Sequence, residues 1–311
     1  MNIDKYLNEL DSLYSYDIRT KNALKKIIPC MIKYYGNEYE NIILSAIRDC
    51  EIIHCDSFQT ISKVLNSNNL SDAVYEIKNN DGVYVSKPNI VYDDVNNEFI
   101  VSDVIRKIVI SHTYNFDSPK GLEVLTLQLC SLVKSYYKEY FIQDNILQKN
   151  NGIAITRQKI NYNTGSITLD FLDSSNHSLE EGMNYYDTER IVSDVLNDTY
   201  KCYGFDSIYS IAMILKEKYR LKSIINRAEI LKDMFTLKRI YNVDPDDFDK
   251  LSVLADNCYE LEEKMIVYSM TREEKNKIRE ELTNLLSKDV YNCLVKYISL
   301  DNKKEFKTSE I

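Results

Sequence analysis

The sequence is poor in the residues that break helices and form flexible segments. Only 7 of its 311 residues are glycine and 4 are proline, while 44% are hydrophobic. A chain of this length can bury a large core, so the composition predicts a folded, helix-rich protein with few disordered linkers. By length alone it could form one large domain or two moderate ones.

Long hydrophobic runs are also missing. No window approaches eighteen consecutive apolar residues, and the first residues, Met1 to Lys5, open a polar, amphipathic segment without the apolar stretch of a signal peptide. We therefore expect a cytoplasmic protein with no membrane partner.

The sequence has neither paired metal-binding cysteines nor a concentrated run of positive charge. Its seven cysteines form an odd count without C-x-x-C spacing, which favours reduced, mostly buried thiols over a disulfide framework or a zinc ribbon. The formal net charge is -9, and the richest basic stretches, 25–26 and 216–227, are interleaved with apolar residues at helical spacing. Nucleic acid is therefore not expected as the main partner.

Hydrophobic periodicity predicts helices at both ends of the chain. Apolar residues recur at helical spacing in five N-terminal segments, 3–15, 19–35, 37–50, 57–65 and 71–77. From about 188 onward the pattern is helical again, with breaks near Gly204 and Pro245. These patterns predict an N-terminal helical region at 1–80 and a C-terminal helical region at 191–311.

The middle of the chain carries strand patterns around one central helix. β-branched and aromatic runs occur after a strong turn sequence, at 83–86, 90–92, 98–101 and 107–111. The segments 152–157 and 166–171 predict a hairpin, and 120–138 predicts a mostly apolar helix that begins after Ser118-Pro119. We expect the α+β class, with a small, mainly antiparallel sheet packed on the central helix.

Two motifs in this part of the chain resemble those of a known family. The central helix ends Leu132-Val133-Lys134-Ser135-Tyr136, and a later segment reads Leu179-Glu180-Glu181-Gly182-Met183-Asn184-Tyr185-Tyr186-Asp187. From about 107 to 190 the chain resembles small zincin-like, gluzincin-type metallopeptidases from AT-rich bacterial genomes, whose helix carries H-E-x-x-H. The resemblance implies a zincin-like core at 81–190.

The residues that would carry zinc chemistry are replaced. In H-E-x-x-H two histidines on one helix face bind zinc, and the glutamate takes a proton from the metal-bound water. The matching segment here reads Leu127-Gln128-Leu129-Cys130-Ser131. The resemblance implies metal ligands at Leu127 and Ser131, a base at Gln128 and a third ligand at Glu181. Leucine has no lone pair to offer, serine is a poor neutral ligand, and glutamine accepts no proton near pH 7. We therefore expect a degenerate site with no metal, no cofactor and no peptidase activity.

Several of these residues also have simpler interpretations. Ser178 and Glu181 have the spacing of a capping box at a helix start. His177, followed by Glu180 and Glu181, allows a weak metal site, although a solvated histidine near a helix start is the simpler interpretation. His112 could pair with Cys130 or Ser131 as a nucleophile couple, but the sequence supplies no orienting third group.

Three functions follow from these alternatives. The first is a catalytically inactive metallopeptidase-like protein, a pseudoenzyme, that binds a protein or peptide. The second is a structural or regulatory helical protein with a passive core. The third is an enzyme whose site has moved to His112, His177 and Glu181.

The first function predicts where a partner binds. In zincin-type folds the substrate lies along an edge strand beside the active-site helix, where unpaired backbone groups can bond to it. We take 107–111 as that edge strand and predict partner contacts at five positions, namely Lys107, Ser111, His112, Tyr114 and Tyr185.

Overall fold

The fold comes from a computed structural model, which describes residues 2–55, 58–67, 70, 81–111, 114–163, 166–202, 205–213, 215–216, 221–234 and 245–285. These residues form a mixed α+β protein with two small sheets, so the expected fold class is confirmed at this level. The chain forms two compact units. Unit 1 comprises Met1–Asn151, Arg157–Leu172 and Asp187–Cys202, and unit 2 comprises Gly152–Thr156, Asp173–Tyr186 and Tyr203–Ile311.

The N-terminal helices of unit 1 follow the predicted periodicity. They are α1 (Ile3–Tyr14), α2 (Ile18–Tyr35), the short 3₁₀ helix η1 (Asn37–Tyr39) and α3 (Glu40–Arg48). The side chains of Asn2 and Asp17 cap α1 and α2 by accepting backbone N–H bonds from Lys5 and Thr20. α2 continues through Pro29, so the proline does not end this helix. The predicted helix at 71–77 lies outside the described residues.

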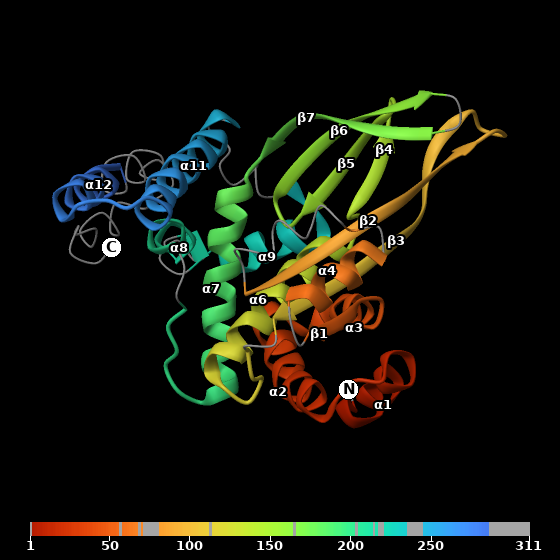
Figure 1. The fold of residues 1–311 in the computed structure, drawn as a ribbon, viewed down its shortest axis with the longest axis horizontal. Helices are drawn as coiled ribbons and strands as arrows, with labels where there is room; N and C mark the ends of the chain where they lie inside the picture. The colour runs from red at the N-terminus through yellow and green to blue at the C-terminus, as the bar shows by residue number, and fades with distance from the viewer. Residues whose placement is uncertain are drawn as a thin grey trace. The chain divides into compact units, whose positions relative to one another are not determined.

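The first sheet of unit 1 has the strand order β1-β3-β2 (Figure 1). β1 (Glu51–Cys55) runs parallel to β3 (Glu98–Ser111), and β2 (Gly82–Asp93) runs antiparallel to it. β1 was not predicted. The expected separation of 83–86 from 90–92 is wrong, because β2 continues through Pro88 with a register shift at Asn89/Ile90. Proline is tolerated here because β2 is an edge strand, where its missing N–H can face away from the ladder.

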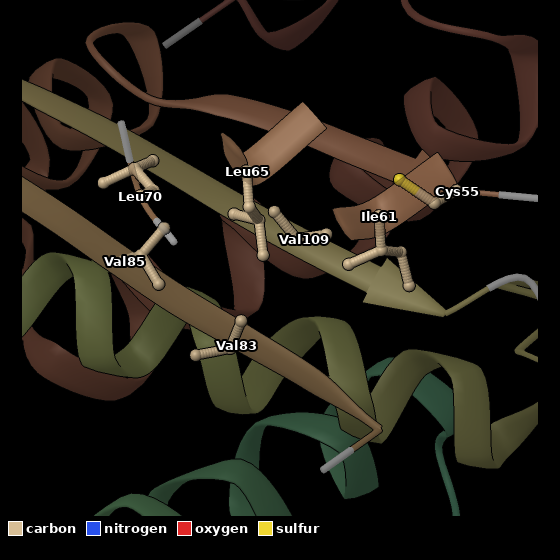
Figure 2. Packing of buried hydrophobic residues seen from close by; sticks show 7 residues of the cluster. All are labelled: Cys55, Ile61, Leu65, Leu70, Val83, Val85 and Val109. Atoms are coloured by element: carbon tan, nitrogen blue, oxygen red, sulfur yellow. The ribbon is translucent and has the colours of Figure 1, made fainter. Parts of the chain in front are cut away.

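An apolar cluster joins this sheet to helix α4 (Phe58–Ser67). Figure 2 shows its seven buried side chains, Cys55, Ile61, Leu65, Leu70, Val83, Val85 and Val109. The cluster covers one face of the sheet, with α4 contacting β1 and β3.

The central helix α6 (Pro119–Tyr136) confirms the prediction for 120–138. Ser118 is its N-cap, and its hydroxyl accepts the backbone N–H of Gly121, while Pro119 occupies the first turn. Most of the helix is buried, and it packs on β2, β3 and α3. The helix that carries the resemblance is therefore the core helix of unit 1.

The second sheet has the order β4-β5-β6-β7. Its strands are β4 (Tyr140–Gln143), β5 (Ile146–Asn151), β6 (Ala154–Asn163) and β7 (Ser166–Ser175). The predicted hairpin is confirmed as β6 and β7, whereas β4 and β5 were not predicted. Phe99 of the first sheet packs with Leu147 and Ile160 of the second, so a shared apolar cluster joins the two sheets.

The remaining helices begin with α7 (His177–Leu196), within which the boundary between the two units falls. Unit 2 also contains α8 (Asp206–Met213), α9 (Lys222–Leu231), α11 (Pro245–Val267) and α12 (Arg272–Leu285). Pro245 marks the start of α11, in agreement with the predicted break. None of the helices in the described part of the chain is both long and apolar enough to cross a membrane.

Candidate functional site

The side chain of Gln128 is committed to the fold of unit 1. Its amide oxygen accepts the backbone N–H of Tyr84 at 2.7 Å, and the side chain is buried beneath β2. Because β2 is an edge strand, no described strand offers this N–H a partner on its outer side. Gln128 therefore satisfies a strand edge, and no proton acceptor stands at this position.

Leu127 and Ser131 lie one helical turn apart on α6, and both are half-buried. The Ser131 hydroxyl donates to the backbone carbonyl of Leu127 at 3.3 Å, an ordinary bond for serine inside a helix. This side-chain set does not fit a zinc ion, because leucine offers no donor atom and the neutral hydroxyl is a weak one. Nor does any group of three His, Cys, Asp or Glu side chains among the described residues have an arrangement that could hold a metal ion.

The two motifs that carry the resemblance are joined by a buried ion pair. Lys134 of α6 and Asp187 of α7 are both fully buried, with the ammonium nitrogen 2.8 Å from the carboxylate. The hydroxyl groups of Tyr34 and Tyr35 on α2 donate to the same carboxylate at 2.6 and 3.2 Å. Lys134 and Asp187 therefore hold α2, α6 and the part of α7 that belongs to unit 1 together.

A second bond anchors the end of α6. The Ser135 hydroxyl donates to the side-chain oxygen of Asn151 at 2.8 Å, next to the end of β5. Ser135 belongs to the same Lys-Ser-Tyr segment as Lys134. The conspicuous residues of this motif thus have structural partners within unit 1.

Cys130 is buried on the side of α6 that faces Thr188 of α7. The Thr188 hydroxyl lies 3.8 Å from its sulfur, and burial raises the pKa of the thiol to about 11. A cysteine nucleophile needs the opposite shift, toward the thiolate at neutral pH. The geometry therefore disfavours Cys130 as half of a nucleophile couple with His112.

This burial predicts the order in which the thiols are alkylated. With a pKa of about 11, roughly one Cys130 thiol in a thousand is ionised at pH 8. We expect iodoacetamide to modify the half-buried Cys30 long before Cys130 in the native protein, as measured by peptide mass spectrometry. Denatured protein, in which both thiols react, is the control. Equal native rates would contradict the prediction.

In unit 2 the first glutamate of the Leu-Glu-Glu-Gly motif supports a tight turn. Glu180 is buried and accepts the backbone N–H of Ile153 at 2.8 Å. Gly152 has a φ of 58°, and a Cβ there would lie 2.0 Å from the Glu180 carboxylate. Glycine is required at position 152 because of the positive φ and because the Glu180 carboxylate approaches the backbone too closely for a Cβ atom.

The glycine of the same motif permits close helix packing. A Cβ on Gly182 would lie 2.4 Å from the carbonyl oxygen of Ile208 on α8. The capping box predicted at Ser178 is wrong, because Asn176, with a φ of 62°, already accepts the first helical bond from the Glu180 N–H at 2.9 Å. Asn176 therefore precedes the helix, and Ser178 lies inside it.

Glu181, the position that the resemblance implies as a third ligand, also lies in unit 2. Burial raises the pKa of its carboxyl group, while a hydrogen bond from Tyr185 opposes that shift. His177 is exposed, and its Nε2 lies 3.0 Å from the Thr156 hydroxyl. Glu181 and His177 are therefore each engaged with a neighbouring side chain.

The prediction that 107–111 form an edge strand is wrong. These residues pair with β1 on one side and with β2 on the other, so they lie in the centre of the sheet. The reason is β1, a five-residue strand that follows a helical run directly and carries no turn signal. A partner cannot add to the sheet at Lys107 or Ser111, because their backbone groups already have two neighbouring strands.

The residues predicted to contact a partner differ in how exposed they are and in what they bind within the fold. Lys107 is buried and its ammonium group pairs with Glu51. Tyr114 is half-buried and donates its backbone N–H to Ser111 at 3.2 Å, and Tyr185 is half-buried on α7. His112 lies outside the described residues. Roles for Tyr114 and Tyr185 in binding stay predictions.

Sequence reasoning missed a second buried polar group in unit 1. Glu139 is buried and accepts from Arg106 Nε at 2.8 Å and from the Tyr84 hydroxyl at 2.8 Å. No local pattern marks these residues as a group, because they come from β2, β3 and the loop between α6 and β4. For the Lys134–Asp187 pair the sequence did offer a signal. A lysine within an apolar helix is expected to be buried, and a buried charge needs a partner.

Searches against protein-family models, curated proteins and solved structures find no match for this chain.

Proposed function

We propose that this chain is a catalytically inactive metallopeptidase-like protein that acts in the cytoplasm as a protein-binding module. The observation that carries the proposal is the bond between the Gln128 amide oxygen and the Tyr84 N–H. At the position where the resembled family has its catalytic base, this chain has a side chain that stabilises a strand edge.

The pattern of retained and replaced residues supports loss of an ancestral activity. The motif residues with structural partners, Lys134, Ser135 and Asp187, match the resembled family. The residues that differ are those on which zinc chemistry depends, Leu127, Gln128 and Ser131. A pseudoenzyme keeps the scaffold of an enzyme while its reactive side chains are replaced. The proposal therefore includes a zincin-like architecture for residues 81–190.

Binding of another polypeptide is supported by exposed apolar side chains on the sheets of unit 1. They lie on β2, β3, β4, β6 and β7, and include Val91, Tyr92, Ile100, Ile105, Phe141, Tyr162, Leu169, Phe171 and Leu172. Exposed large apolar side chains favour protein contact over solvent where they gather in a patch. The proposed recognition surface therefore lies on these exposed apolar side chains of the two sheets, in place of 107–111.

An enzyme relocated to His112, His177 and Glu181 has less support. The His177 ring lies within hydrogen-bond distance of Thr156, and Glu181 is bonded to Tyr185. In the alternative, a structural or regulatory helical protein with a passive core, the terminal helical regions carry the function. Truncating the terminal helices would then abolish partner binding.

The test restores the family pattern at the three replaced positions. Wild-type protein purified without chelator is expected to hold no stoichiometric zinc by elemental analysis and to cleave no peptide. The variant with Leu127→His, Gln128→Glu and Ser131→His is expected to gain zinc. Circular dichroism checks that each variant folds.

Two results would count against the proposal in different ways. Zinc in the wild-type protein that is lost with Glu181→Ala or His177→Ala would overturn catalytic inactivity. A folded triple variant that binds no zinc would overturn the zincin-like scaffold.

A further inference from the structure

The inference concerns the outer strands of the two sheets. Among the strands that the structure describes, β1, β2, β4 and β7 lie at sheet edges. β1 and β4 are only five and four residues long. Along β2 the Tyr84 N–H is bonded to Gln128, the Ser86 carbonyl accepts the Tyr140 hydroxyl at 3.0 Å, and Pro88 has no N–H. Short length, side-chain caps and proline are devices that prevent edge pairing.

β7 is neither short nor interrupted by proline. It is ten residues long and contains no proline, lysine or arginine. Leu169, Phe171 and Leu172 are 37%, 64% and 46% exposed. A ten-residue edge strand that carries exposed large apolar side chains, with no described strand on its outer side, is a site for pairing with another strand.

We infer that β7 pairs antiparallel with β7 of a second copy of this chain, about a two-fold axis at Leu169. The inference rests on the proposed binding function and names its partner. We take the two-fold axis to be perpendicular to the sheet. Odd-numbered residues then lie opposite odd-numbered residues of the second copy, and even-numbered opposite even-numbered, so each face of one sheet continues into the same face of the other.

The pairs nearest the axis in this register are complementary. Leu169 lies opposite Leu169 of the second copy, and Ile167 lies opposite Phe171, so one face pairs apolar with apolar. On the other face Thr168 lies opposite Asp170, which places a hydroxyl donor beside a carboxylate. An axis at Asp170 would instead place two carboxylates opposite each other, which is unfavourable.

Asp170 is already partly satisfied within each copy. Its carboxylate accepts the Asn161 side-chain N–H at 2.7 Å across the β6–β7 hairpin. The edge can therefore pair without leaving this charge unbonded. An isologous contact of this kind needs only one self-complementary strand, which a two-fold dimer uses twice.

The expected dimer is weak. Two paired edge strands bury less than about 1,200 Å², the low end of specific interfaces. We expect sedimentation equilibrium of the full chain, between about 1 and 100 μM, to show a monomer–dimer equilibrium. Leu169→Lys, which places two ammonium groups together on the axis, should shift the association constant at least tenfold toward monomer. Val95→Lys, at a site 91% exposed in the β2–β3 turn, is the matched control and should dimerise as wild type.

Cross-linking reports the register independently of affinity. Leu169→Cys should form an intermolecular disulfide under mild oxidation, because each copy faces its own equivalent. Thr168→Cys should not, because it faces residue 170, and wild-type protein measures the background of the native thiols. Monomer throughout the range with no cross-link at 169, or a dimer that Leu169→Lys leaves intact, would overturn the inference. Neither result changes the zinc content of the restored variant, so the two proposals fail separately.

Discussion

Replacing Asp187 by alanine is expected to lower the free energy of unfolding by about 3–5 kcal/mol. The change leaves the Lys134 ammonium group fully buried without its carboxylate, and it removes the acceptor of the Tyr34 and Tyr35 hydroxyl groups. An uncompensated buried charge is far more costly than the loss of a solvated one. Urea denaturation followed by circular dichroism measures the difference.

A second ion pair that also involves α7 provides the control. Lys33 of α2 and Asp194 of α7 lie 2.8 Å apart, with side chains 73% and 41% exposed. Because solvent and salt screen an exposed pair, Asp194→Ala should cost less than about 1 kcal/mol. Equal losses for the two alanine variants would contradict the assigned role of Asp187.

The double variant Lys134→Met with Asp187→Leu separates charge from packing. Removing both charges avoids the unpaired ammonium group, so much of the stability lost in Asp187→Ala should return. If the double variant is as unstable as Asp187→Ala, packing around the pair and not its charge accounts for the loss.

Replacing Glu139 by alanine should have the next largest effect, about 2–4 kcal/mol. Glu139 is the common acceptor of Arg106 and Tyr84, and burial followed by the nearby Glu139 carboxylate raises the pKa of the Tyr84 hydroxyl well above its ordinary value. Alanine leaves a mostly buried guanidinium group and a buried hydroxyl without this acceptor. Denaturation in urea at neutral pH is the measurement.

Two variants set the scale for Glu139. Glu139→Gln keeps an acceptor oxygen but loses the charge, so it should cost less than alanine. Asp4→Ala removes the partner of Lys25 in a mostly exposed pair and should have almost no effect. A Glu139→Ala loss no larger than that of Asp4→Ala would show that the group is not a structural acceptor.

The difference between Lys134 and Gln128 shows how far a motif can guide prediction. Both stand on α6, and both were singled out in the sequence. Gln128 could be excluded as a base from its chemistry alone. Its bond to Tyr84 could not be foreseen, because the partner is a backbone group on a strand 44 residues away. The same holds for Asp187, which lies 53 residues beyond Lys134.

Local patterns by themselves determined the helices α1, α2 and α6 and the β6–β7 hairpin. In each, the periodicity of apolar residues or a terminal cap such as Ser118 lies within the segment that it predicts. The loss of the zinc-binding residue types is likewise legible in Leu127, Gln128 and Ser131, since it depends only on which atoms each side chain contains.

Only the tertiary structure decided which strands lie at the edges and which charges are paired. Residues 107–111 became central because the distant strand β1 docks beside them in parallel, and a parallel partner leaves no turn signal between the two strands. β7 is an edge strand because no described strand pairs on its outer side. Which strands pair depends on how segments far apart in sequence pack together. The interactions within a single segment therefore do not determine it.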